Sequence, residues 1–357
     1  MFDYKVKKDN ESKRLKSYAR TGLINLKDIS KDESDDTSYL NAILQCLGNI
    51  NEIVNFLINS KNEDIIIEDM KNKKTGKYPL LFVIQRLINR LYPLDSKNKI
   101  ESYSAENILT ILNSKTKAYS DYKKKNPNDV LHNILFRLEK ELNNNNTISN
   151  SEVVPLINNF YCSYLNKFKC KNCNSSEDII RKFLTFQLDI FDYFRTEGNN
   201  ENINIKLAEL IEFDIKEKTH KKHCNNCNSQ QETEIIKEIN KSPNIFIFLL
   251  FNEDPIDKAD ELHKITFNIE EQIRMGDFIR DEDSPKNYEI FGIVSISMRE
   301  RKYVSFSKSL VDEEWYLYND EKVTKINLDF IQTSIENYNF YFPCILFYRS
   351  IVKKKEK

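Results

Sequence analysis

The sequence predicts an α+β fold in which helices come first and antiparallel strands follow. In the first 150 positions apolar residues recur every three or four residues, which is the period of an amphipathic helix. After about position 180 they alternate with polar residues or form short apolar runs, as in strands. A chain of 357 residues with 40% hydrophobic residues is also long enough to bury a large core.

Four helices are expected in the first half. The first covers 40–47, where apolar residues fall at i, i+3, i+4 and i+7, and Thr37 is placed to cap its N-terminus. The second covers 80–91, is opened by Pro79 and stops before Pro93. The same period continues over 105–113 and 129–142.

Strands are expected to dominate the second half. Apolar and polar residues alternate from Leu184 to Ile190, as in a half-buried strand, whereas 245–251 is an apolar run typical of a fully buried one. Further strands are expected at 265–269, 288–297, 303–307, 315–318 and 340–349. Residues 1–20 carry seven basic residues and no apolar period, which predicts a flexible extension.

Composition and charge exclude several classes of function. The net charge of −1 gives no general attraction to nucleic acid or to an anionic membrane, so neither is an expected partner. Six glycines, never closer than sixteen residues apart, exclude both the Rossmann fingerprint and the P-loop. No segment approaches the roughly 20 apolar residues that span a bilayer, and the N-terminus lacks the apolar centre of a signal peptide. We therefore expect a protein of the cytoplasm, the nucleus or both.

Two C-x-x-C pairs, Cys170/Cys173 and Cys224/Cys227, are separated by 50 residues. Each pair can present two thiolates from one tight turn, and two such turns on adjacent hairpins supply the four soft ligands of a tetrahedral Zn²⁺ site. We expect one structural zinc, with four reduced thiols and no metal as the alternative. His223 is a possible substitute ligand, but an exposed bystander is favoured. The remaining cysteines lie in apolar stretches and are expected in the core: Cys46, Cys162 and Cys344.

Several segments resemble the ubiquitin-specific proteases, in the order in which that family carries them. Thr21-Gly-Leu-Ile-Asn25-Leu, followed by Thr37-Ser-Tyr-Leu-Asn-Ala-Ile-Leu-Gln-Cys-Leu47, resembles their Cys box, GLxNLGNTCYLNAxLQxL. Asn128-Asp129 resembles the QDAxEF segment, and the C-x-x-C pairs fall where the family carries zinc knuckles. The other similar segments are 245–249 (the strand before LKRF), 288–294 with 302–306 (the His box), 315–323 (W…FDDxxV) and 345–348 (the terminal strand).

The resemblance implies a papain-like cysteine-protease fold of the ubiquitin-specific type over residues 20–351. It implies a helical thumb at about 20–150, fingers of zinc-knuckle hairpins at about 151–243, and a palm with an antiparallel sheet at about 244–351. A flexible basic extension, 1–19, and a basic tail, 352–357, would flank this domain. In the family a Cys thiolate attacks, a His takes its proton, and an Asp or Asn orients the His.

The departures from the family pattern fall on the catalytic positions. Ser38 stands at the nucleophile, Lys302 stands at the His, and only Asn319 fits, as the orienting residue. Asn25 matches the oxyanion-hole asparagine, but twelve residues, 26–37, separate it from Ser38 where the family has four, and the extra stretch is acidic. A serine hydroxyl needs a neighbouring base, and an acidic insertion opposes an oxyanion. These positions predict an inactive hydrolase.

Three functions remain open from the sequence. The first is a pseudo-deubiquitinase that serves as a binding or scaffold subunit for ubiquitin, a ubiquitin-like protein or a larger complex, such as an RNA-processing or proteasome-linked assembly. The resemblance assigns Asp129 to ubiquitin contact, and a helix N-cap is its alternative role. The second is an active hydrolase of ubiquitin C-terminal bonds, which would need a Ser38–Lys302 dyad beside Arg301, or Cys46 as the nucleophile. The third is a structural subunit without ubiquitin affinity.

Overall fold

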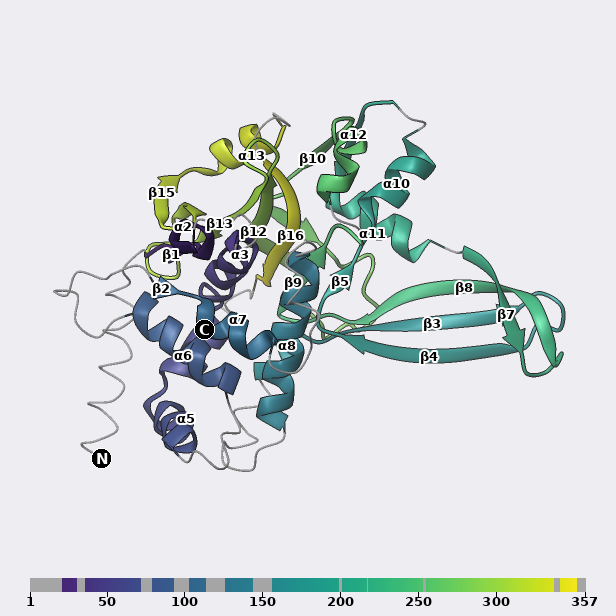
Figure 1. Cartoon of the computed structure of the whole chain (residues 1–357). Helices are drawn as coiled ribbons and strands as arrows, with labels where there is room; N and C mark the ends of the chain where they lie inside the picture. Colours follow the sequence, from purple (N-terminus) through teal and green to yellow (C-terminus); the bar gives the residue numbers. More distant parts are fainter. Residues whose placement is uncertain are drawn as a thin grey trace, which may run out of the picture. The chain divides into compact units, whose positions relative to one another are not determined.

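The computed structural model describes most of the chain (Figure 1): residues 21–30, 36–71, 79–92, 103–113, 126–143, 156–198, 201–216, 218–252, 255–336 and 341–351. The predicted extension, the predicted tail and residues 31–35 of the acidic stretch lie outside these ranges. Two compact units result, Met1–Ile157 with Phe291–Ile345, and Asn158–Ile290 with Leu346–Lys357. Within the described ranges, none of the helices has the length and apolarity that a membrane span requires.

Helices form most of the first part of the first unit, as predicted. The four expected helices are confirmed as α3 (Ser38–Leu47), α6 (Pro79–Leu91), α7 (Glu106–Asn113) and α8 (Pro127–Asn143). The sequence analysis did not predict α2 (Leu26–Ser30), α4 (Asn51–Ile58), α5 (Ser60–Lys71), α13 (Leu328–Glu336) or the short parallel pair of β1 (Leu23–Ile24) with β2 (Tyr103–Ser104).

The N-termini of two of these helices are capped differently from one another. At α6, which begins at Pro79 as predicted, the Glu141 carboxylate of α8 accepts from the backbone N–H groups of Leu80 (3.1 Å) and Leu81 (2.9 Å). The predicted side-chain cap by Thr37 on α3 is wrong. The Thr37 hydroxyl accepts from Leu26 N–H instead (3.1 Å), since it faces the preceding helix α2.

The largest sheet has the strand order β15-β14-β13-β12-β16-β9-β5, with β11 added at β12. Its strands are β5 (Phe186–Gln187), β9 (Ile245–Leu249), β11 (Gln272–Arg274), β12 (Asn287–Ser297), β13 (Lys302–Lys308), β14 (Trp315–Asn319), β15 (Lys322–Ile326) and β16 (Tyr341–Ser350). Both β12 and β16 contribute residues to the two units. In the first unit α3 packs against β13. Ser305 on β13 is fully buried there, and its side chain contacts Cys46 on α3.

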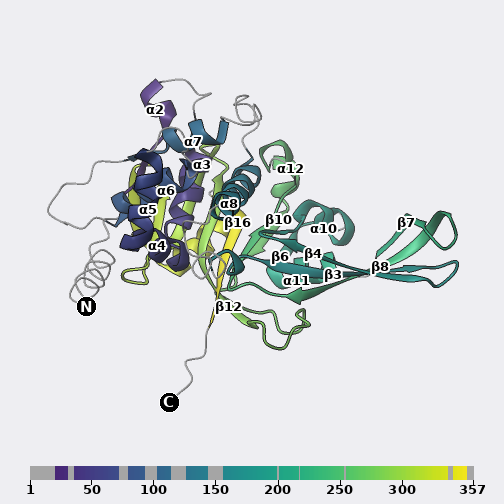
Figure 2. The same cartoon turned by 90° about the horizontal axis from the view of Figure 1, so that it is seen from below.

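A second sheet, in the second unit, has the order β4-β3-β8-β7 and is antiparallel throughout. Its strands are β3 (Cys162–Cys170), β4 (Ser176–Phe183), β7 (Lys218–Cys224) and β8 (Ser229–Lys241). The β3–β4 and β7–β8 turns lie at the same end of this sheet (Figure 1), and β3, β4 and β8 also run together in Figure 2. These hairpins carry the two C-x-x-C pairs.

The second unit also corrects two predictions. The expected strand at 184–190 is wrong beyond β5, because Asp189 caps a helix, α10 (Ile190–Glu197), by accepting from the N–H groups of Phe191 and Asp192 (both 3.0 Å). Strand pairing is not purely antiparallel, since β5 pairs with β9 in parallel, as does β6 (Ile203–Lys206) with β10 (Ile265–Asn268). Further helical elements of this unit are α11 (Leu207–Ile215), a 3₁₀ turn at Pro255–Lys258 and α12 (Ala259–Leu262).

Candidate functional site

Ser38, at the predicted nucleophile position, begins α3 and is fully buried. Its hydroxyl donates to Asp36 Oδ2 (3.0 Å) and accepts from the backbone N–H of Tyr303 on β13 (3.0 Å). The packing of α3 on β13 therefore brings together the positions at which the sequence places the nucleophile and the proton acceptor. Both the hydroxyl proton and one of its lone pairs are engaged by the protein itself.

Asn25, the predicted oxyanion residue, directs its amide at two carboxylates. Its Nδ2 donates to Asp36 Oδ1 (2.6 Å) and to Asp320 Oδ2 (3.2 Å). Asp36 Oδ1 also accepts from the backbone N–H of Ser38 (3.0 Å). A backbone N–H and a side-chain amide are the kinds of donor that build oxyanion holes. The Asp36 carboxylate thus lies between two such donors, whereas the sequence showed only that the stretch 26–37 is acidic.

Lys302, at the position of the family's His, faces Asp320 rather than Asn319. Its Nζ lies 3.5 Å from Asp320 Oδ2 and 3.3 Å from Glu300 Oε2. Within the described residues the buried Oδ1 of Asn319 has no hydrogen-bond partner. Sequence reasoning missed Asp320, because nothing in the Asn-Asp dipeptide shows which of the two side chains turns toward β13.

Asp320 is a buried carboxylate in a polar cluster. Its Oδ1 accepts from Asn41 Nδ2 (2.9 Å), in addition to the Asn25 and Lys302 contacts of Oδ2. Burial raises the pKa of Asp320 above its usual value, and the neighbouring Asp36 adds to this, against the opposing effects of Asn41, Asn25 and Lys302. The cluster therefore holds two acids and one cation beside a serine.

Arg301, next to Lys302, adopts a φ of 50° in the turn between β12 and β13. This is the left-handed region, which favours glycine. The turn thus has a glycine-like backbone conformation although its residue is an exposed arginine.

Two further candidate residues, Cys46 and Asp129, lie on helices of the first unit. Cys46 is fully buried on α3, and burial raises the pKa of its thiol far above the usual value, as is typical of a core cysteine. Asp129 is exposed in the first turn of α8. Asn126 accepts from Asn128 N–H there (2.9 Å), so Asn126 serves as a cap of this helix.

The four predicted metal ligands come together in the second unit. The sulfurs of Cys170, Cys173, Cys224 and Cys227 all lie within 4.8 Å of one another. The Cys170–Cys227 and Cys173–Cys224 pairs are 3.9 and 3.6 Å apart. Zinc–sulfur bonds of about 2.3 Å in a tetrahedron give a sulfur–sulfur spacing of about 3.8 Å. The cysteines therefore fit a four-coordinate metal such as zinc, and His223 is an exposed neighbour, as expected.

Both turns that carry these cysteines repeat one pattern, C-x-N-C-N-S, at 170–175 and at 224–229. In each, the asparagine after the second cysteine has a positive φ, 57° at Asn174 and 49° at Asn228. Asparagine tolerates this conformation better than most residues do. The repeat is a sequence signal for two equivalent knuckles, and the sequence analysis used only its C-x-x-C part.

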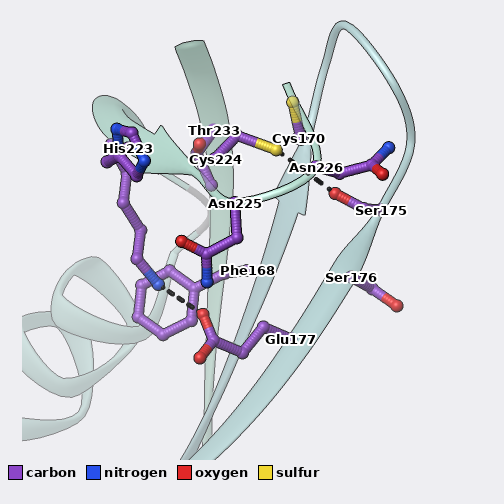
Figure 3. A pocket seen from close by; sticks show the side chains of 11 residues that line it. Phe168, Cys170, Ser175, Ser176, Glu177, His223, Cys224, Asn225, Asn226 and Thr233 are labelled. Carbon is purple, nitrogen blue, oxygen red and sulfur yellow. Dashed lines mark hydrogen bonds and ion pairs between the residues drawn. The ribbon is translucent and has the colours of Figure 1, made fainter. Parts of the chain in front are cut away.

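Polar side chains surround the sulfurs. The Ser175 hydroxyl lies 3.1 Å from Cys173 Sγ. It also lies 3.4 Å from Cys224 Sγ, a contact that Figure 3 shows as a dashed line. Hydrogen bonding by Ser175 is the main cause that lowers the pKa of Cys173, to about 5. Asn172 Nδ2 donates to Cys227 Sγ (3.4 Å), but the neighbouring sulfurs outweigh this contact and raise the pKa of Cys227 to about 12. Thiolates are the form that binds metal, so the donors favour metal binding.

A cavity of about 260 Å³ lies beside this cluster (Figure 3). On one side of it the Lys222 ammonium group lies 2.8 Å from Glu177 Oε2 and 3.6 Å from the centre of the Phe168 ring. This contact ties β7 to β3 and β4 next to the knuckles.

Comparison with known proteins identifies the family. Residues 22–348 match the family described as "Ubiquitin carboxyl-terminal hydrolase". The chain belongs to this family. Ubiquitin carboxyl-terminal hydrolase 25 of Arabidopsis thaliana is 23% identical to it over 306 residues, which cover 81% of this chain and 43% of the relative. The chain therefore spans less than half the length of this member of the hydrolase family.

Solved structures with this fold include the deubiquitinating module of SAGA. The chain resembles a chain of the Ubp8/Sgf11/Sus1/Sgf73 module bound to ubiquitin aldehyde with a TM-score of 0.62 at 19% identity, covering 96% of this chain and 71% of the other. The same module bound to monoubiquitin gives a TM-score of 0.63 at 19% identity, with the same coverage. The α+β fold of the ubiquitin-specific proteases is therefore confirmed.

Proposed function

We propose that this chain is an inactive ubiquitin-specific-protease-like protein that acts as a binding or scaffold subunit. One observation carries the proposal, which is that Asp36 engages both the Ser38 hydroxyl (3.0 Å) and the Asn25 amide (2.6 Å). In an acyl-transfer enzyme the first group attacks and the second stabilises the oxyanion. Here one side chain of the protein occupies both.

The electrostatics of the cluster oppose catalysis as well. An oxyanion that formed between Ser38 N–H and Asn25 Nδ2 would coincide with Asp36 Oδ1, which accepts from both donors. A developing negative charge needs donors that are free to meet it, and loss of one such donor costs about 10²–10³ in rate. Lys302 is paired with Asp320 and Glu300, so it is a charged partner of acids and a poor general base for the serine.

The proposed partner is ubiquitin, a ubiquitin-like protein or the protein subunits of a larger complex, in the cytoplasm, the nucleus or both. The similar solved chains belong to modules bound to ubiquitin aldehyde and to monoubiquitin, together with other protein subunits. Asp129, the residue proposed for ubiquitin contact, is exposed on α8 and accessible to a partner.

We further propose that the four knuckle cysteines hold one structural zinc, which their sulfur spacing supports. The purified protein should carry about one zinc per chain by elemental analysis, and Cys170→Ser should lower its melting temperature, because metal binding stabilises only the folded state. A chelator should destabilise the unchanged protein more than this variant. Protein without metal, as stable as before after Cys170→Ser, would contradict the zinc proposal.

Inactivity is tested with a fluorogenic ubiquitin C-terminal conjugate. The protein at micromolar concentration should release no more fluorophore than its Ser38→Ala variant. Turnover that this substitution abolishes would show an active hydrolase. Titration with ubiquitin then separates the binding subunit from a structural subunit, since only the former gives saturable binding, weakened by Asp129→Lys.

A further inference from the structure

We propose that Ser175 is a positioning residue of the metal site, whose hydroxyl joins a sulfur of each knuckle and raises the affinity for zinc. This inference rests on the proposed zinc site. The Ser175 Oγ lies 3.1 Å from Cys173 Sγ and 3.4 Å from Cys224 Sγ, and these two sulfurs, one from each hairpin, are 3.6 Å apart.

The charge of the site explains why such a donor matters. Four thiolates around one Zn²⁺ carry a net charge of −2, and hydrogen bonds to the sulfurs offset part of it. Outer partners of metal ligands typically change metal affinity by about 10–100-fold. Ser175 is held for this task by the backbone, since its carbonyl accepts from Cys170 N–H (3.0 Å).

The repeat in the two knuckles shows that the role belongs to one serine. Ser229 occupies the position of Ser175 in the second C-x-N-C-N-S turn. Its hydroxyl donates to the Cys227 carbonyl oxygen (3.2 Å) and accepts from Gln231 Nε2 (2.9 Å). The two serines thus match in residue type and motif position, but the described contacts of Ser229 go to oxygen and nitrogen atoms.

The asparagines of the repeat behave symmetrically instead. Asn172 of the first knuckle donates to Cys227 of the second (3.4 Å), and Asn226 of the second hydrogen-bonds to Cys173 of the first. Each knuckle therefore supports the other's second cysteine through an asparagine. Ser175 breaks this symmetry, because it adds a contact to Cys224 that has no described counterpart at Cys170.

The experiment compares zinc affinity among full-chain variants by competition with a chromophoric chelator. Ser175→Ala should weaken binding by about 10–100-fold, whereas the control Ser229→Ala should stay close to the unchanged protein. Ser175→Thr keeps the hydroxyl and should restore most of the affinity. Far-UV circular dichroism of the zinc-loaded variants checks that each one is folded.

Substitution of cobalt for zinc gives a second measurement, which would not change if Ser175 had only a structural role. Removing a donor from a thiolate raises the energy of its sulfur electrons, so the sulfur-to-cobalt charge-transfer bands of Ser175→Ala should shift to lower energy. Those of Ser229→Ala should not. If the unchanged protein binds neither metal, the zinc site itself is wrong. If it binds both and the two alanine variants behave alike, the role of Ser175 alone is overturned.

Discussion

Asp36 accepts hydrogen bonds from three donors at the start of α3: the Ser38 hydroxyl, the Ser38 backbone N–H and the Asn25 amide. Buried polar groups are costly without partners. A protease leaves comparable donors available for its substrate, whereas this chain supplies a carboxylate of its own. The sequence shows that residue 36 is acidic and near Ser38, but not that its two oxygens divide between hydroxyl and amide, since this depends on the packing of β13.

Asp320 gives the fold a pH dependence that can be predicted in sign. Its pKa in the folded state lies above the ordinary value of 3.8, so the folded chain retains a proton that the unfolded chain releases. Stability should therefore fall as the pH rises from about 4 through the raised pKa. Asp320→Asn has no such proton. The stability of the unchanged protein relative to this variant, from urea titrations, should decrease between about pH 4 and pH 7; a constant difference would contradict this.

Arg301 tests whether the turn retains a conformation suited to glycine. A non-glycine residue in the left-handed region costs about 1–2 kcal/mol, and glycine carries an entropy cost of about 0.5–1 kcal/mol. Arg301 has a φ of 50°, so Arg301→Gly should raise the free energy of unfolding by about 0.5 kcal/mol. Arg299 is exposed in the same turn without a positive φ, so Arg299→Gly should lose stability. Equal losses in chemical denaturation would rule out strain at Arg301.

Among the helices and strands, the pattern of apolar residues predicted the segments that bury many side chains. The helices α3, α6, α7 and α8 and the buried strand β9 belong to this group. It failed at 184–190, where a single capping side chain, Asp189, starts a helix within an alternating pattern. The parallel pairing of β5 with β9 and of β6 with β10 could not be predicted. The sequence of a single strand does not determine which strand pairs with it, because this depends on the other strands of the sheet.

The start of β1 depends on a close approach between the backbone at Gly22 and the backbone of residues 320–321. A Cβ atom at Gly22 would overlap the carbonyl oxygens of Glu321 and Asp320, and the latter also accepts from Leu23 N–H. Backbone atoms cannot rotate away, so Gly22→Ala should cost about 1–3 kcal/mol. Gly276→Ala is the matched control, because its Cβ would meet only side-chain atoms, the nearest at 3.6 Å. Similar thermal stability of the two variants would contradict this contact.

Across the chain, sequence reasoning found the four knuckle cysteines more fully than the polar cluster at Ser38. The cysteines were predictable because a metal needs few residue types at short spacing. The cluster at Ser38 joins Asn25 to Asp320, which are 295 positions apart in the sequence. Its acidic residues are also typical of a solvent-exposed loop, so the sequence alone does not show that they form a cluster. The same fold can carry different side chains at the positions of a catalytic site. Function depends on those side chains, so the fold alone does not determine it.

A double variant can separate the effect of the triad side chains from the effect of their surroundings. Ser38→Cys with Lys302→His, leaving Asn319 in place, supplies a cysteine, an imidazole and an orienting amide. We expect no cleavage of the fluorogenic ubiquitin conjugate. Asp36 Oδ1 would still accept from Asn25 Nδ2 and from the backbone N–H of residue 38. The oxyanion would then lack both donors, each of which is worth about 10²–10³ in rate.

Cleavage should require that the acidic connection is changed as well. Deletion of residues 28–35 leaves four residues between Asn25 and Ser38, as in the family's Cys box, and Asp36→Asn removes the competing charge. With Arg301→Gly added, turnover should rise above that of the double variant and disappear when the new cysteine at 38 is replaced by alanine. Robust cleavage by the double variant alone would mean that Asp36 and the connection yield to the substrate. The fold would then be a competent protease scaffold only two substitutions from activity.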